Sequence, residues 1–386
     1  LKQGERRTWT IAFADINTPG EFEETIHKVA GVPMIRMPQT VYQPKETATF
    51  EVLAAAPTVE VTDSEGKLQK VTVKSKSGHV KEVSCMLPSV GLYTVKVTDG
   101  DKQSQGVLSA HASWEWTMER AREGALKYHQ KATSHIESWY GFHSSFIAAR
   151  YFPEKQLDEA LRSRFDYLFG LLHDRTKMVP LYHASRIQNT SGTIGLLVDK
   201  YEAYGDVEDL KKASRLADWL MNTWQRKDGA YVNHNTVYTS VIYVAKSMLE
   251  LTLVERELGK TESVWKEAAD RHYASAKRAI DQLVASQGDF ETEGELTFED
   301  GMVSCSALQI GMLALMQQDE KERKHYTDAM LQILNSHDCL TQLRVPDARR
   351  RGGTMRYWEA QYDVQMLPNM FNSPHGWSGW RAYATY

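Results

Sequence analysis

Polar and aromatic side chains open several apolar segments of this chain, and their types suit proton transfer at a sugar acid. Arg, Asn or His neutralises the carboxylate of a uronic acid, which acidifies the neighbouring carbon-bound proton and stabilises an enolate-like intermediate. A Tyr or His removes that proton, and a Tyr or a water molecule protonates the departing oxygen. A free Tyr has a pKa of ~10, so a basic Tyr needs a cation beside it. The residue types therefore favour β-elimination from a glycan that contains uronic acid.

The candidate residues stand at the starts of successive apolar segments. Tyr238 is the candidate base, and His183, His234 and Arg356 are the candidate catalytic groups around the substrate carboxylate. The candidate substrate-binding residues are Trp139, Tyr140, His143, Arg186, Asn189, Asn235, Glu299, Asp300, Glu359, Tyr362 and His375.

Each candidate also has a purely structural interpretation. His143 in GFHSSF is equally well a hydrogen-bonded histidine of the core. Asn235 is a preferred residue for capping the next helix. Glu299 and Asp300 suit the start of a helix, although adjacent acids at a buried helix end are costly without a partner.

Two other classes of function stay open. A glycoside hydrolase needs two carboxylates ~5–9.5 Å apart, which Glu299 or Asp300 opposite Glu359 would supply. A non-catalytic glycan-binding protein needs the aromatic side chains and not the titratable ones. An unsaturated uronate product distinguishes the lyase, and substitution of the three acids distinguishes the hydrolase from the binding protein.

The elements that position these residues are predicted to be helices from Ser113 onward. Amphipathic segments alternate with segments that are almost uncharged, which is the pattern of outer and inner helices in an (α/α) barrel. The predicted outer segments are 153–172, 206–224, 263–286 and 318–336. The predicted inner segments start near Trp139, Thr190, Thr236, Gly301 and Trp358.

The first 112 residues show a different pattern, with short β-branched runs separated by Gly, Pro, Asp and Ser. Such runs predict an antiparallel sandwich. The fold class is therefore mainly α, an (α/α) toroid of five to six helix pairs preceded by an all-β immunoglobulin-like domain. The expected parts are the end of a preceding β domain with a linker (1–41), the sandwich (42–112) and the catalytic barrel (113–386), with a first strand at 8–14.

The composition narrows the possible partners. Lys and Arg number 46 against 50 Asp and Glu, giving a net charge of −4, so we expect no nucleic acid partner. No apolar run reaches the ~18 residues of a membrane helix. Cys85, Cys305 and Cys339 lack metal or disulfide spacing, and no phosphate-binding or dinucleotide motif occurs, so we expect no metal or cofactor. Because the chain starts without Met and ends inside an apolar run, we expect a piece of a longer protein.

Three motifs resemble a known family. WYGFHSSF, FEDGMVSCSA and SPHGWSGW, behind an immunoglobulin-like module, are similar to the C-terminal part of multi-domain proteins of gut Bacteroidetes, and specifically to the L-rhamnose-α-1,4-D-glucuronate lyases. The resemblance covers residues 113–386. It implies an (α/α)6 toroid with a central pocket and a tyrosine base, in a lyase acting on arabinogalactan in the periplasm or outside the cell. Tyr238 is the first choice for that base, followed by Tyr140 and Tyr362.

Overall fold

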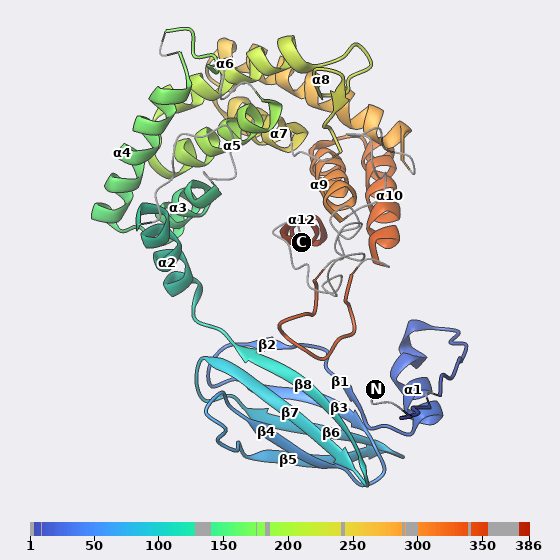
Figure 1. Cartoon of the computed structure of the whole chain (residues 1–386). Helices are drawn as coiled ribbons and strands as arrows, with labels where there is room; N and C mark the ends of the chain where they lie inside the picture. The colour runs from blue at the N-terminus through green and yellow to red at the C-terminus, as the bar shows by residue number, and fades with distance from the viewer. Residues whose placement is uncertain are drawn as a thin grey trace. The chain divides into compact units, whose positions relative to one another are not determined.

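A computed structural model describes residues 4–8, 10–127, 140–174, 176–181, 186–240, 244–287, 290, 300–338, 341–353 and 378–386. It divides the chain into two compact units. The sandwich unit contains residues 1–113 and 342–352, and the helical unit contains residues 114–341 and 353–386. The structure confirms the predicted fold class, a β-sandwich followed by paired helices (Figure 1).

The sandwich consists of two four-stranded sheets in the described residues. One sheet has the order β1 (Met34–Arg36), β3 (Thr47–Leu53), β6 (Val80–Met86) and β5 (Val71–Ser77). The other has the order β2 (Val41–Tyr42), β8 (Lys102–Ala110), β7 (Gly91–Asp99) and β4 (Thr58–Thr62). All pairs are antiparallel except β2 with β8.

The core of the sandwich follows from the alternation of side chains along each strand. In β3, Ala48, Phe50 and Val52 are buried while the residues between them face outward. Tyr93 of β7 is fully buried, and its hydroxyl donates to the carbonyl of Ser89 at 2.7 Å, which satisfies its polar end.

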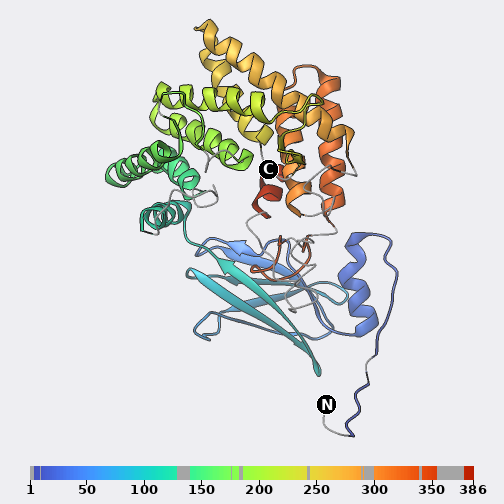
Figure 2. The ribbon, with the colours of Figure 1, turned by 45° about the horizontal axis from the view of Figure 1, so that its top comes forward.

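Two segments outside the strands complete this unit. Helix α1 (Phe22–Ala30) follows a short 3₁₀ turn at Pro19–Glu21, ends at Gly31 with φ 64°, and stands beside the sandwich (Figure 2). The segment 342–352 lies along β8, where Val107 donates to the carbonyl of Pro346 at 2.8 Å and accepts from Ala348 at 2.9 Å. Residues from opposite ends of the sequence therefore build one unit.

The structure departs from the sequence-based prediction at three places in this unit. The described residues of 8–14 form no strand, α1 was not predicted, and 342–352 falls in the range expected for the barrel. Strand propensity at 8–14 lacks a partner strand in the described residues, and a strand is stable only when its backbone groups are paired.

The helical unit is an arc of inner and outer helices (Figure 1). The inner helices are α3 (Tyr140–Tyr151), α5 (Ile187–Tyr204), α7 (Val244–Leu258) and α9 (Asp300–Met316), and consecutive ones contact each other. The outer helices are α4 (Lys155–Leu172), α6 (Val207–Trp224), α8 (Ser263–Ala285) and α10 (Glu320–His337). Helix α2 (Trp114–Lys127) packs on α3 and α4, and α12 (Ser378–Thr385) packs on α9.

Inner and outer helices differ in burial as the sequence pattern predicts. In α5 every residue from Ile187 to Val198 is buried, whereas α6 buries one stripe that includes Leu210, Ala213 and Leu220. Acidic side chains cap α6 and α10: Asp206 accepts from the backbone of Glu208, and Asp319 accepts from two backbone N–H groups. None of the described helices has the length and apolar character needed to cross a membrane.

A buried histidine ties one inner helix to two outer helices. His272 of α8 is fully buried, with Nδ1 2.7 Å from Glu255 of α7 and Nε2 3.3 Å from Asp218 of α6. Burial alone lowers the pKa of His272, but the hydrogen bonds to Asp218 and Glu255 outweigh it, so the pKa is raised.

We predict that this histidine makes the helical unit less stable at high pH. Because its folded pKa is above its unfolded value of ~6.5, its contribution is fully present below about pH 6.5 and is lost as pH rises through the folded pKa. The measurement is the free energy of urea unfolding as a function of pH. His272→Gln should flatten the fall on the alkaline side, and His325→Gln on the exposed face of α10 should not. Equal slopes in both variants contradict the prediction.

Candidate active site

Three inner helices converge at Gly195 of α5. A Cβ atom at this position would lie 3.3 Å from Ser247 Oγ, 3.4 Å from His143 Cε1 and 3.8 Å from Glu250 Oε2. Glycine therefore lets side chains from α3 and α7 meet against the backbone of α5. The small residues Ser191 and Ser247, whose hydroxyls are 3.4 Å apart, maintain the same close packing between α5 and α7.

His143 and Asp199 form a dyad at this meeting point. His143 Nδ1 is 2.5 Å from Asp199 Oδ2, and the two side chains are 24% and 20% exposed. A carboxylate only accepts, so it selects the tautomer in which Nδ1 carries the proton and Nε2 is an acceptor. This is the arrangement that orients a histidine for general base catalysis.

Lys246 and Glu250 lie one turn apart on α7, with Nζ 2.7 Å from Oε2. Burial alone lowers the pKa of Lys246, but the carboxylates of Glu250 and Asp199 outweigh it, so the pKa is raised and the ammonium stays charged. The first turn of α7 is held from α9, because Gln309 Oε1 accepts from the backbone N–H of Ala245 at 2.9 Å. Gln309 Nε2 in turn donates to the carbonyl of Thr239 at 2.8 Å.

Tyr383 of α12 joins the same group of charges. Partial burial and the negative charges of Glu250, Asp199 and Glu202 raise its pKa, with Lys246 opposing. The phenol is therefore neutral at physiological pH and able to donate a proton. A tyrosine in this environment suits a general acid rather than a general base.

Glu202 completes the group, which we call the inner-helix cluster and define as His143, Asp199, Glu202, Lys246, Glu250 and Tyr383. Glu202 pairs with Arg150 of α3 at 2.5 Å. Burial raises its pKa, and Asp199 and Glu250 add to the effect while Arg150 opposes it. In the described ranges, no three His, Cys, Asp or Glu side chains are placed to hold a metal ion.

The structure describes some of the residues predicted from the sequence. Arg186 precedes α5, and Asn189 is buried in its first turn. His234 and Asn235 are exposed at the tip of a hairpin formed by β9 (Val232–Asn233) and β10 (Thr236–Val237), where His234 has φ 56° and its ring meets the edge of Trp224 at 5.3 Å. Tyr238 is 8% exposed and belongs to the hydrophobic core of the helical unit.

His234 and Tyr238 therefore lie in different environments: His234 is exposed at the hairpin tip, and Tyr238 is in the hydrophobic core. His143 is the sequence-predicted residue that lies in the inner-helix cluster. Tyr140 and Asp300 begin α3 and α9. The remaining candidates lie outside the described residues: Trp139, His183, Glu299, Arg356, Glu359, Tyr362 and His375.

The other five members of the inner-helix cluster were not among the sequence candidates. A signal was present for Lys246 and Glu250, because they are the charged residues in the otherwise apolar first half of α7, and for Asp199, because it follows an uncharged stretch of α5. A charged side chain on a buried helix face needs a partner, so a charged residue within an inner helix is as good a candidate for the site as a polar residue at a helix start. Tyr383 carried no comparable signal, since its position near these charges depends on the packing of α12 against α9.

The fold is similar to that of a solved polysaccharide lyase. That structure, described as "Polysaccharide Lyase BACCELL_00875", superposes with a TM-score of 0.72 and 12% sequence identity. The match covers 95% of this chain and 56% of the lyase, so the chain spans little more than half the length of that protein. At this identity the likeness establishes the fold.

Two further structures are more distant. A family 76 glycoside hydrolase from a bovine Bacteroides thetaiotaomicron strain has a TM-score of 0.40 and 10% identity, covering 80% of this chain and 79% of that one. An unsaturated glucuronyl hydrolase from Bacillus sp. GL1 has a TM-score of 0.44 and 13% identity, covering 59% of this chain and 68% of that one. Likenesses this weak support no conclusion about function. No protein-family model matches the sequence, and no curated protein matches it either.

We predict that Asp199 fixes the tautomer of His143. In Asp199→Asn the amide either accepts or donates, so the preference for a proton on Nδ1 is lost and the Nε2-protonated form becomes populated. Nitrogen-15 chemical shifts of the His143 ring report the two forms. Asp270→Asn, on the exposed face of α8, is the matched control and should leave the ring unchanged. The same tautomer in both variants contradicts the assignment.

Proposed function

We propose that this chain belongs to a polysaccharide lyase that cleaves a uronate-containing glycan by β-elimination at the inner-helix cluster. The observation that carries the proposal is the His143–Asp199 dyad at 2.5 Å, with Tyr383 near enough that the charge of Asp199 helps to raise its pKa, in a chain whose fold matches a polysaccharide lyase. A base and an acid in one cluster are what elimination requires.

In this mechanism His143 Nε2 removes the proton at C5 of the uronate, and Asp199 stabilises the imidazolium that forms. Lys246, whose ammonium stays charged, neutralises the substrate carboxylate as negative charge moves onto it. The electron pair from the C5–H bond forms the C4–C5 double bond, and the C4–O bond breaks. Tyr383 gives its proton to the leaving oxygen, so the products are an unsaturated uronate and a new hydroxyl end.

Tyr238, the base predicted from the sequence, stays a prediction, but its place in the core favours His143 for this role. The finer substrate, a rhamnosyl-glucuronate cap of arabinogalactan, is part of the proposal and rests on the resemblance of the three motifs. An extracellular glycan of this kind fits a periplasmic or secreted enzyme.

A glycoside hydrolase is the second candidate, and one observation favours it. Glu202 has a raised pKa because it is partly buried and lies near Asp199 and Glu250. A carboxyl group with a raised pKa next to ionised carboxylates is the pattern of a hydrolase general acid.

The decisive assay incubates the full polypeptide that carries this sequence with a rhamnosyl-glucuronate glycan and records the ultraviolet absorbance of an unsaturated product. We expect His143→Gln and Tyr383→Phe to lower kcat by roughly a hundredfold or more, because each removes a proton-transfer group. His325→Gln and Tyr386→Phe, both at exposed positions, are the matched controls.

Other outcomes reassign the reaction. Release of a reducing end without the chromophore, abolished by Glu202→Gln, establishes the hydrolase instead. Loss of activity in Tyr238→Phe together with normal activity in His143→Gln returns the base to the tyrosine predicted from the sequence. Binding without any cleavage supports the non-catalytic alternative.

A further inference from the structure

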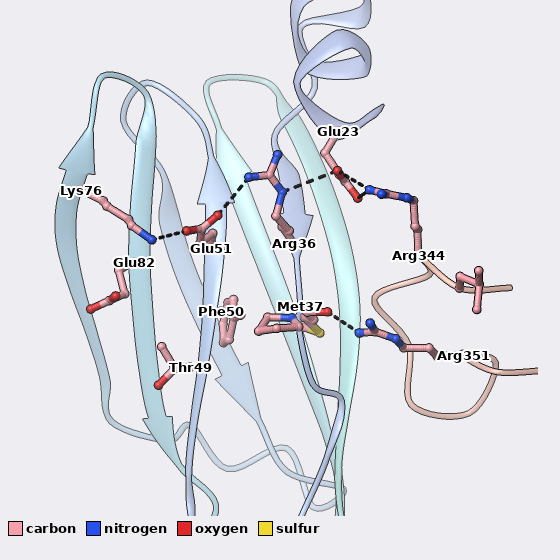
Figure 3. Close-up of a pocket in the computed structure, with 12 residues that line it drawn as sticks. Glu23, Arg36, Met37, Thr49, Phe50, Glu51, Lys76, Glu82, Arg344 and Arg351 are labelled. Carbon is pink, nitrogen blue, oxygen red and sulfur yellow. Dashed lines mark hydrogen bonds and ion pairs between the residues drawn. The ribbon is translucent and has the colours of Figure 1, made fainter. Parts of the chain in front are cut away.

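The sandwich unit contains a cavity of about 420 Å³ that the proposed reaction does not use. It lies over the outward face of the sheet β1-β3-β6-β5 and is closed at one side by α1 and by the segment 342–352 (Figure 3). This volume is within the range of small-molecule sites. All the lining residues belong to the sandwich unit, so the cavity is a property of that unit alone.

A chain of alternating charges forms one wall of the cavity (Figure 3). The successive ion-pair distances are 2.6 Å from Lys76 to Glu51, 3.1 Å from Glu51 to Arg36, 3.5 Å from Arg36 to Glu23, and 3.1 Å from Glu23 to Arg344. The hydrogen bond from Lys76 is the main cause of the lowered pKa of Glu51. This wall is preorganised, because each charge holds its neighbour in place.

Three charged groups at the cavity keep hydrogen-bonding or ion-pairing capacity that this chain of ion pairs does not use. Glu82 lies directly opposite Glu51 in the sheet, and its side chain makes no hydrogen bond or ion pair with a described residue, although the charge of Lys76 acts on it from a distance. Arg36 Nη2 is buried without a hydrogen bond in the described part of the chain, and Glu24 is 3.6 Å away. Arg351 donates to the carbonyl of Met37 but pairs with no described carboxylate.

Arg36, Arg351 and Glu82 are together complementary to a ligand that carries both a carboxylate and hydroxyl groups. Arg36 Nη2 has an ion pair with Glu24 at 3.6 Å but no hydrogen bond with a described residue, so an incoming carboxylate can supply a charge-assisted hydrogen bond there. Two carboxylates opposite each other on neighbouring strands repel, and hydroxyl donors on a ligand relieve that repulsion at Glu82. In Figure 3, Arg351 and Glu82 lie on different sides of the cavity, so a ligand must span it.

We propose that this cavity binds the acidic end of a saccharide, with its carboxylate on Arg36 and Arg351 and its neighbouring hydroxyls on Glu82 and Thr49. Because the saccharide class comes from the proposed lyase reaction, this inference rests on that function. The only aromatic ring lining the cavity, Phe50, is 1% exposed, so stacking does not contribute. Recognition is therefore by charge and hydrogen bonds, and the affinity falls as salt rises.

The test measures binding of a glucuronate-ended disaccharide to the full polypeptide by calorimetry at low and high salt. Methyl glucoside, which lacks the carboxylate, should bind at least about tenfold more weakly, the loss of one charge-assisted hydrogen bond. Glu82→Gln and Arg351→Ala should each weaken binding by about tenfold at low salt. Glu60→Gln, at an exposed position on the opposite sheet, is the matched control and should bind normally.

Since Arg351 also contacts Met37, its variant is checked by the amide NMR spectrum of the sandwich unit. Glu82→Gln removes no contact between described residues, so it decides the question even where Arg351→Ala disturbs the fold. Unchanged affinity in Glu82→Gln overturns the inference. So does tighter binding of a dipeptide, whose ammonium and carboxylate fit the same groups.

The two proposals fail in different ways. If the protein forms the unsaturated product normally but Glu82→Gln does not change glucuronate binding, the cavity proposal is wrong and the lyase proposal stands. If glucuronate binding is salt-sensitive and is weakened by Glu82→Gln, but the protein forms no unsaturated product, the lyase proposal is wrong and the cavity still binds glucuronate.

Discussion

The close approach of α3, α5 and α7 at Gly195 is the constraint on which the inner-helix cluster depends. With no Cβ on α5 at this point, the His143 ring and the Ser247 hydroxyl approach its backbone within van der Waals distance. Helices packed this tightly leave little room for water, so each charge at the contact needs a protein partner. The pairs His143–Asp199 and Lys246–Glu250 are the consequence. The chemistry we propose is therefore a product of the same packing that makes the helices inner ones.

The sequence predicted the arrangement of helices well, because the distribution of charge along a helix reports directly on how many sides are buried. Segments 206–224 and 263–286 closely match α6 and α8, and the inner segments predicted near Thr190 and Gly301 match α5 and α9. The inner segment predicted to start near Thr236 is wrong at its start, because residues 232–237 form the hairpin β9–β10 and α7 begins only at Val244. The strands TATFEVL and GLYTVKVTDG match β3 and β7 for a similar reason, since alternation marks a half-buried strand.

The candidate site was predicted less completely. His143 is a polar residue near the start of its helix, which the sequence pattern indicates, but its partner Asp199 stands 12 residues into α5 and comes near only through the stagger of neighbouring helices. Tyr238 illustrates the opposite case. The polar residues near Tyr238 in the sequence are typical of a functional site, but the chain enters the hydrophobic core directly after β10 and places Tyr238 there. Segment 342–352 was not predictable either, since its partner Val107 lies more than 230 residues earlier.

That long-range pairing has a consequence for how the protein is made. The backbone groups of Val107 that face 346–348 have no partner segment until the chain has been translated past the whole series α2 to α10. At elongation rates of roughly 5–20 residues per second this delay is on the order of tens of seconds. During that time the nascent sandwich exposes an incomplete edge. Glu23 has not yet paired with Arg344, and the carbonyl of Met37 has not yet accepted a hydrogen bond from Arg351. The last residues of the sandwich unit are thus translated after helices α2 to α10, so this unit is completed late in synthesis.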